Sequence, residues 1–338
     1  MAEQIKPSLK DFLVVHPGPW AHGVALRAGI SMLVPLLVLV AMGRPEWSAY
    51  AAFGAFTSLY GRNHIHLSRA VMQASAGALL TVSVVAGVLV GNLASRAWVA
   101  VGVAAVVAVL GSLAAAVQDW HPPGPLFLVF AFGAVASVPH ALSDVPVAAA
   151  IASGSALFAV LVGNVAGLLR LQRSRPGRLA PPRPADAVRC ALAALLAGGV
   201  ATAVDIGHPY WAMVAAVAPL SAPGLSSQLV RAGHRIIGTL LGLLISAVLL
   251  APTLGPLGTV LLVAGLGIVT ELVVARNYGL ALLFITPMAM LMGQLADPRP
   301  IGPLLFDRGV ETVIGASIGG LIVLAEQLLR RRALRRAG

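Results

Sequence analysis

Three basic side chains share one face of a predicted helix and form the clearest candidate for a binding site. Arg231, His234 and Arg235 are spaced i, i+3 and i+4, which places them together on one side of an α-helix. Residues 219–224, just before this helix, contain two prolines and a glycine, which stop regular helix and expose the next helix start. Cations beside an exposed helix N-terminus suit an anion. Arginine also offers a carboxylate a two-pronged contact and keeps its charge where water is scarce.

These three residues also have a plainer interpretation. Arginines near the inner end of a membrane helix can orient the helix and contact lipid phosphate without taking part in transport. His234 could take up a proton during a transport cycle, because histidine titrates near neutral pH, or it could bond to headgroups or backbone. The residues alone leave both interpretations open.

Three carboxylates are candidates for proton transfer. Glu271 lies in the last turns of an otherwise apolar helix, at the depth where Asp119 ends an earlier one. Carboxylates at such places often relay protons, although Arg276, five residues on, could instead neutralise Glu271. Glu311 follows Arg308 by one helical turn, and an ion pair at this spacing would give it a structural role.

Metal, redox and enzyme chemistry find little support in the sequence. His64 and His66 have no neighbouring carboxylate or thiol, so a loop is a better interpretation than a metal site. Cys190 is the only cysteine, which excludes an internal disulfide and any site built from several cysteines. No DDxxD, HExxH or nucleotide-binding motif is present. We therefore expect no metal, no cofactor and no enzyme activity.

The composition is that of an integral membrane protein. Of the 338 residues, 58% are hydrophobic and only 10% are charged, and the mean hydropathy is +0.90. The formal charge of +11 is spread over the loops between apolar segments with few aromatic residues nearby, so it indicates orientation in the bilayer and not nucleic-acid binding. The first twenty residues are polar and rich in proline, and we expect no signal peptide.

Twelve apolar segments follow one another along the chain, and four are too short to cross about 30 Å of hydrocarbon. We expect an all-α membrane protein in which the short segments meet around a cavity, because membranes tolerate broken helices only there. The four short segments are residues 47–60, 125–138, 210–219 and 279–293. The eight long ones are residues 22–42, 70–93, 98–117, 147–169, 187–206, 232–250, 256–275 and 310–329.

Matching landmarks predict an internal repeat. We expect two parallel six-helix repeats, residues 1–172 and 187–338, joined by a basic, proline-rich cytoplasmic linker at 173–186. The matched pairs, 162 or 164 residues apart, are Arg27 with Arg189, Arg69 with Arg231, and Trp47 with Trp211.

The distribution of basic residues predicts the orientation. With both termini cytoplasmic, only four of the 23 Lys and Arg residues fall outside, which predicts a multi-pass protein of the inner membrane. The four are Arg44, Arg96, Arg299 and Arg308.

The run RIIGTLLG at residues 235–242 resembles the fusaric acid resistance (FUSC) and aromatic acid exporter family, whose repeats carry R-x-x-G-T-x-x-G after a P-x-W element. Tyr210 and Trp211 fall in the matching P-x-W element, and Tyr278 matches a polar residue of the fifth helix. Residues 308–315 resemble the R-x-x-[DE]-T-x-x-G opening of the sixth helix. The resemblance is good over residues 187–332 and weaker over 22–173. It implies an exporter of aromatic acids, and it extends to malate channels whose paired six-helix units line an anion path with arginines.

The chain departs from this family in two respects. Many exporters of this family have a large cytoplasmic domain between or after the halves, and here we expect only the linker. The first half of the chain has Met72 and Gln73 where the second has His234 and Arg235, so a shared path would take most of its positive field from the second half.

We expect a secondary transporter that exports small hydrophobic organic anions, such as aromatic carboxylates, with proton coupling as a further hypothesis. Alternatives are a passive anion channel, a membrane enzyme acting on lipid, and a non-transporting scaffold of the envelope. The expected partners are the anion and membrane lipids, with a homo-oligomer or an envelope protein as further candidates and no nucleic acid. The substrate-binding candidates are Arg231, His234, Arg235, Arg69, Trp211, Tyr210 and Tyr278, and the proton-coupling candidates are Glu271, Glu311 and Asp119.

Overall fold

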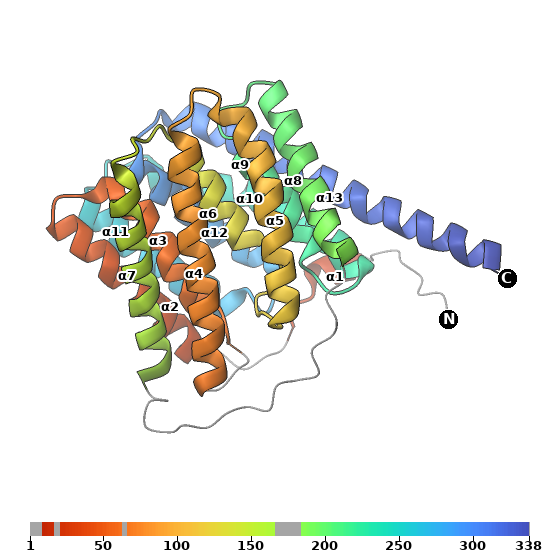
Figure 1. Cartoon of the computed structure of the whole chain (residues 1–338), viewed down its shortest axis with the longest axis horizontal. Helices are drawn as coiled ribbons and strands as arrows, with labels where there is room; N and C mark the ends of the chain where they lie inside the picture. Colours follow the sequence, from red (N-terminus) through yellow and green to blue (C-terminus); the bar gives the residue numbers. More distant parts are fainter. Residues whose placement is uncertain (1–8, 17–20, 63–65, 166–183, 338) are drawn as a thin grey trace.

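The computed structural model of the chain describes residues 9–16, 21–62, 66–165 and 184–337 (Figure 1). All secondary structure in these ranges is helical, which confirms the predicted all-α class. The predicted linker, residues 173–186, lies outside the described residues except for its last three, as does His64.

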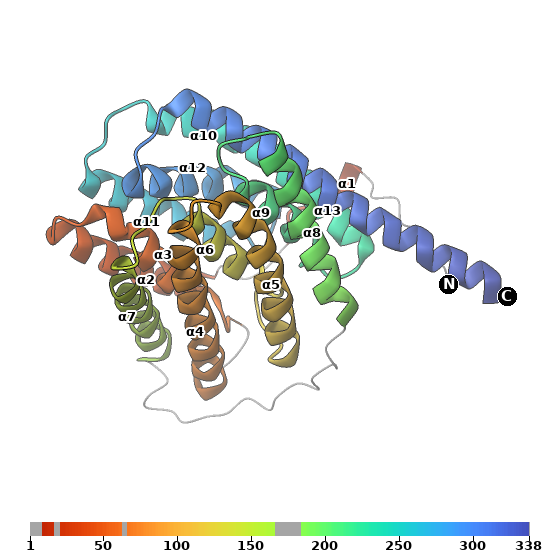
Figure 2. The ribbon, with the colours of Figure 1, turned by 45° about the horizontal axis from the view of Figure 1, so that its top comes forward.

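Nine helices in the described ranges are long and apolar enough to cross a membrane, so the chain is a multi-pass membrane protein. They are α2 (His22–Ala41), α4 (His66–Gly91), α5 (Arg96–Val117), α7 (Asp144–Asn164), α8 (Pro184–Ala203), α10 (Leu225–Leu250), α11 (Pro256–Val273), α12 (Tyr278–Ala296) and α13 (Ile301–Ala337). The last of these extends well beyond the other helices in both views (Figures 1 and 2).

Three shorter segments lie among these helices. They are α3 (Ser48–Ala55) between the 3₁₀ turns η1 (Pro45–Trp47) and η2 (Phe56–Leu59), then α6 (Leu126–Ala136) and α9 (Tyr210–Leu220). Almost all of α3 and α9 is buried, which explains why these helices are apolar on every side. The fourth predicted short segment is wrong, because Pro287 does not interrupt α12 and that helix is one of the nine long ones.

Two helices begin earlier than the sequence predicted, and this changes where their charges lie. Helix α10 begins at Leu225 and not at residue 232, directly after Gly224, whose φ of 80° is a conformation that favours glycine. Helix α13 begins at Ile301 and not at residue 310. Arg231 and Arg308 are therefore about two turns inside their helices, where each lines the interior of the bundle.

The helices pack in a recurring pattern. Helix α4 contacts α3, α6 and α7, and α10 contacts α9, α12 and α13. We call residues 21–165 the first part of the chain and residues 184–337 the second part. Between these two parts, α2 packs on α11, α5 packs on α8, and α6 packs on α9. Figures 1 and 2 show α4 beside α7 and α5 beside α8.

Glycines let several of these helices approach closely. A Cβ built on Gly87 would lie 2.8 Å from the carbonyl oxygen of Phe132, and one on Gly242 would lie 2.8 Å from that of Leu282. A Cβ on Gly315 of α13 would overlap the carbonyl of Ala212 on α9. These contacts are backbone against backbone, so a larger side chain cannot be accommodated by a rotamer change.

We predict that Gly315→Ala destabilises the protein by about 1–3 kcal/mol, because α13 and α9 would have to separate. The matched control is Gly199→Ala, where a Cβ meets nothing within 4 Å. Thermal unfolding in detergent should show a lower midpoint for the first variant only. Equal midpoints for the two variants would contradict the packing described.

Candidate anion-binding site

A cavity of about 440 Å³ lies between the two parts of the chain. Residues of α2, α3 and α6 line one side and residues of α9 to α13 line the other. Its volume is typical of sites for small organic molecules. The short helices contribute to the wall, which agrees with the prediction that broken segments surround a cavity.

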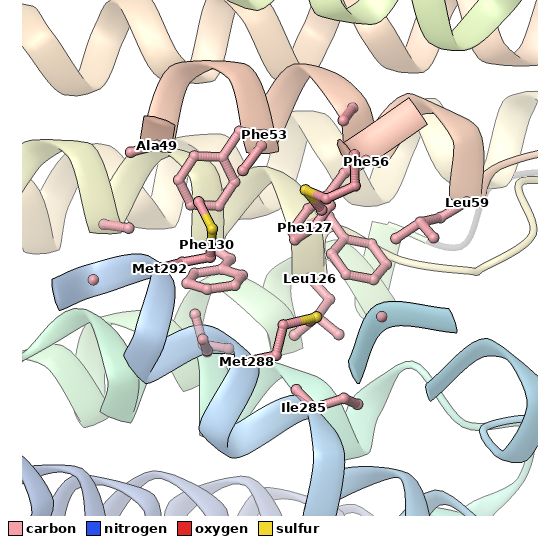
Figure 3. A pocket seen from close by; sticks show the side chains of 18 of the residues that line it. Ala49, Phe53, Phe56, Leu59, Leu126, Phe127, Phe130, Ile285, Met288 and Met292 are labelled. Atoms are coloured by element: carbon pink, nitrogen blue, oxygen red, sulfur yellow. The ribbon is translucent and has the colours of Figure 1, made fainter. Parts of the chain in front are cut away.

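Aromatic and methionine side chains form one part of the cavity wall. Figure 3 shows side chains of α3, η2, α6 and α12 pointing toward a common space. Phe53 and Phe130 pack edge to face with ring centres 5.0 Å apart, and Phe56 packs similarly on Phe127 at 5.2 Å. Met288 and Met292 of α12 face these rings. Such a wall accepts a flat apolar group and can adapt to its shape.

Arg231, Arg235 and Tyr278 form one cluster in the wall. The guanidinium carbon of Arg231 lies 4.2 Å from the centre of the Tyr278 ring, and Nη1 of Arg235 donates to the Tyr278 hydroxyl at 3.0 Å. Arg235 is only 3% exposed. No carboxylate of the described residues forms an ion pair with either arginine. The cluster therefore carries positive charge that a bound anion can neutralise.

Arg308 adds a third cation, which the sequence analysis assigned to the outer end of a helix. It is 1% exposed, its guanidinium carbon lies 3.5 Å from the centre of the Trp211 ring, and it lines the cavity. All three of its guanidinium nitrogens lack a hydrogen-bond partner among the described residues. Its charge is close enough to that of Arg235 for the two to interact. The motif at residues 308–315 was the signal that could have identified it.

Glu311 does not pair with Arg308 as the spacing predicted. Its Oε1 accepts a hydrogen bond of 2.7 Å from the backbone N–H of His208, just before α9, and its Oε2 has no partner among the described residues. No ion pair joins the two side chains, because Arg308 lies over Trp211 instead. Glu311 therefore fixes the start of α9 and leaves Arg308 available.

Glu271 lines the cavity, but Arg276 does not neutralise it as the sequence suggested. Its Oε2 accepts a hydrogen bond of 2.6 Å from Nη2 of Arg62, which follows η2 in the first part of the chain. Both side chains are largely buried. This ion pair joins the two parts of the chain at the cavity wall.

His234 does not line the cavity, although it neighbours Arg235 in sequence. Its Nε2 lies 2.9 Å from the carbonyl oxygen of Phe12, and its ring packs edge-on against the Phe12 ring. Asn277 donates to the same carbonyl at 3.2 Å. His234 therefore attaches the N-terminal residues to α10, which matches its plainer interpretation as a partner for backbone.

Arg69 and Asp119 also lie outside the cavity lining. Arg69 donates to the carbonyl oxygens of Gly61 and Gly163, which ties the start of α4 to neighbouring segments. On α10, Gln228 makes comparable bonds to the carbonyl oxygens of Leu220 and Ala222 at the end of α9. Asp119 is exposed on a turn. Two other candidates, Tyr210 and Trp211, do line the cavity.

We predict that Arg308→Met raises the free energy of unfolding by about 1–4 kcal/mol, because it replaces a buried unpaired cation with an apolar side chain. The midpoint of thermal unfolding should rise accordingly. The substitution should also abolish stabilisation of the protein by added benzoate. The matched control is Arg189→Met, which removes a guanidinium 2.8 Å from Glu326 and should lower the midpoint. A lower midpoint for Arg308→Met with benzoate stabilisation retained would contradict this assignment.

Half of the residues that line the cavity lie within a stretch that matches a known family. Residues 194–322 match the model of the family described as fusaric acid resistance protein-like. These residues include Arg231, Arg235, Arg308 and Tyr278. No curated protein and no solved structure matches the chain. Over residues 194–322, this multi-pass membrane protein therefore carries a fusaric acid resistance protein-like domain.

Proposed function

We propose that the chain is a secondary transporter that exports small hydrophobic organic anions, such as aromatic carboxylic acids, across the inner membrane. The observation that carries the proposal is that two buried arginines, Arg235 and Arg308, have no ion-pair partner among the described residues and line a cavity whose wall is largely apolar. A buried cation requires a compensating charge or hydrogen bonds. An organic anion supplies this charge, and its apolar part suits the remaining wall.

The arrangement of the lining supports an amphipathic ligand. Arg231 lies over the Tyr278 ring and Arg235 donates to its hydroxyl, so a carboxylate beside this phenol can contact both guanidinium groups. Phe127 and Phe130 of α6 offer ring faces and edges to an aromatic group. Neither an inorganic anion nor a neutral hydrocarbon would use both kinds of surface.

The mechanism that we propose is alternating access between two parallel six-helix repeats. The recurring helix contacts support this arrangement, because α4 and α10 have corresponding neighbours and α2–α11 corresponds to α5–α8. In this scheme all twelve predicted segments belong to the transport unit, both termini are cytoplasmic, and the cavity changes its opening as the halves rock. The orientation rests on the distribution of basic residues.

Proton coupling is the finer part of the proposal, and Glu271 is the residue that best supports it. Protonation of Glu271 would neutralise the carboxylate and release Arg62, and with it a bond between the halves. Movement of the halves would thereby depend on the charge of Glu271. Glu311 is a weaker candidate because its Oε1 already holds the start of α9, and exposed Asp119 carries no part of the proposal.

We predict that Arg235→Gln lowers the rate of efflux of a radiolabelled aromatic carboxylate from vesicles on the order of tenfold, the effect of one lost charge-assisted contact. The control is Arg332→Gln on the exposed end of α13, which should transport normally. Counterflow of labelled against unlabelled acid would support a carrier, whereas single-channel currents would favour the passive channel. Unchanged efflux in Arg235→Gln would count against this cavity as the route.

We predict that Glu271→Gln makes efflux insensitive to the proton gradient while exchange of labelled for unlabelled acid continues, because glutamine cannot take up the proton. The matched control is Glu46→Gln, which also lines the cavity but is paired with Arg44 and half exposed. The measurement is efflux before and after an ionophore collapses the gradient. If wild-type efflux persists after the proton gradient is collapsed, the proposed proton coupling is wrong, although the proposed transport can still hold.

A further inference from the structure

A histidine that the proposed function does not use lines one end of the cavity. His208 lies on the turn between α8 and α9 and is 7% exposed. Its backbone N–H is held by Glu311, so its ring has a defined place beside the connection between α12 and α13, residues 297–300. The charge distribution predicts that this end of the cavity faces out of the cell.

The contacts of the ring define its protonation state. Nε2 of His208 lies 2.6 Å from Nη1 of Arg299, and arginine can only donate a hydrogen bond. Nε2 must therefore be the unprotonated acceptor, which makes the imidazole neutral with its proton on Nδ1. That nitrogen is 3.7 Å from Oδ2 of Asp307, too far for a hydrogen bond but close enough to attract a charged ring.

The connection that carries Arg299 is bonded mainly to itself and to the end of α12. Arg299 pairs with Asp297 at 2.7 Å, and its backbone exchanges two hydrogen bonds with the side chain of Gln294. In the part of the chain that the structure describes, the bond from Arg299 to His208 is the one hydrogen bond between this connection and the α8–α9 turn. Loss of this bond would leave the connection free to move away from α9.

We propose that His208 is a proton-binding site that controls whether this end of the cavity is closed. Neutral His208 accepts the bond from Arg299 and holds the α12–α13 connection against the start of α9. A second proton on the ring removes the acceptor and places two cations side by side, so Arg299 leaves. Asp307 then attracts the charged ring, and the connection opens the cavity.

The groups around His208 determine how the charge of its ring responds to pH. Helix α9 contributes the neighbouring Tyr210, and α13 contributes Asp307 and Glu311, with Arg308 beyond Glu311. Burial lowers the pKa of His208 below its ordinary value of 6.5, Arg299 lowers it further, and Asp307 and Asp297 raise it. The ring is therefore neutral at neutral pH and becomes charged only as the pH falls below the ordinary histidine pKa of 6.5. Acid on this face would open the cavity.

This inference rests on the proposed function for its meaning in transport, where acid outside would favour release of the anion. The opening itself can be measured without substrate. Met292 lines the cavity on α12, and the native Cys190 is buried. Met292→Cys in a Cys190→Ala background supplies a thiol whose reaction rate reports access to the cavity. Rates are divided by those of Gly302→Cys, an exposed site that corrects for the pH dependence of the thiol.

With a water-soluble methanethiosulfonate reagent, we expect the corrected rate to rise several-fold as the pH falls from about 7.5 to about 5. This interval extends well below the ordinary pKa of histidine. His208→Gln should keep the rate low at every pH, because its amide oxygen still accepts from Arg299 but does not titrate. Arg299→Gln should give a high rate at every pH. Asp307→Asn should move the rise to lower pH, because the attracting carboxylate is lost.

The control is His140→Gln. His140 also lines the cavity, lies on the connection between α6 and α7, and has a pKa lowered mainly by burial, but among the described residues no arginine donates to its ring. The rise should survive this change. A corrected rate that does not change with pH, or a rise that persists in His208→Gln, would overturn the inference. Absence of anion efflux from vesicles with the labelling pattern intact would overturn the proposed transport function and leave His208 as a proton site.

Discussion

Positive charge held inside an apolar cavity is the constraint on which the rest of the structure depends. Arg235 and Arg308 are 3% and 1% exposed, and the removal of a guanidinium from water is costly unless a partner replaces the water. The Trp211 ring and the hydroxyl of Tyr278 provide partial replacement. A ring face and a phenol compensate a cation less well than a carboxylate does, so the charges stay available to an anion that enters.

The carboxylates nearest to these arginines are kept away from them by other bonds. Glu311 is one turn from Arg308 but holds the backbone N–H of His208, and Glu271 is bonded to Arg62. If either carboxylate turned to the cavity arginines, the site would neutralise itself. The structure therefore depends as much on where it holds its negative charges as on where it places its positive ones.

The ends of the short helices have free backbone groups that lie within the bundle, where water is scarce. These groups need hydrogen-bond partners from the protein. Side chains at the starts of the long helices meet this need. Gln228 donates to the carbonyls of Leu220 and Ala222 at the end of α9, and Arg69 and Gln73 donate to those of Gly61 and Tyr60 after η2. The first turns of α4 and α10 thus complete the short segments, and the next turn of α10 carries Arg231 and Arg235 into the cavity.

Sequence reasoning found the parts of the site that depend on local spacing and missed those that depend on packing. The i, i+4 spacing of Arg231 and Arg235 placed them on one helix face, and both line the cavity. Arg308 was assigned to the wrong place because Pro300, Gly302 and Pro303 hid the true start of α13. The partner of Glu271 comes from a residue 209 positions away, and a chain read in order favours the nearer Arg276. Only the tertiary contacts reveal such pairs.

The two parts of the chain contribute different kinds of side chain to the cavity, and this explains why ligand binding would be linked to movement of one part relative to the other. The cavity takes its phenylalanine rings, such as Phe56 and Phe130, from the first part and takes Arg235 and Arg308 from the second. An aromatic carboxylate that satisfies both surfaces would bridge the interface, with its ring against one part and its charge against the other. Any displacement of the two parts must then weaken one contact or the other. A ligand held within a single part would bind equally well in every arrangement and could not bias the equilibrium between them. A bridging anion stabilises the arrangement that fits it, and this differential affinity is what a transporter needs and a static scaffold does not.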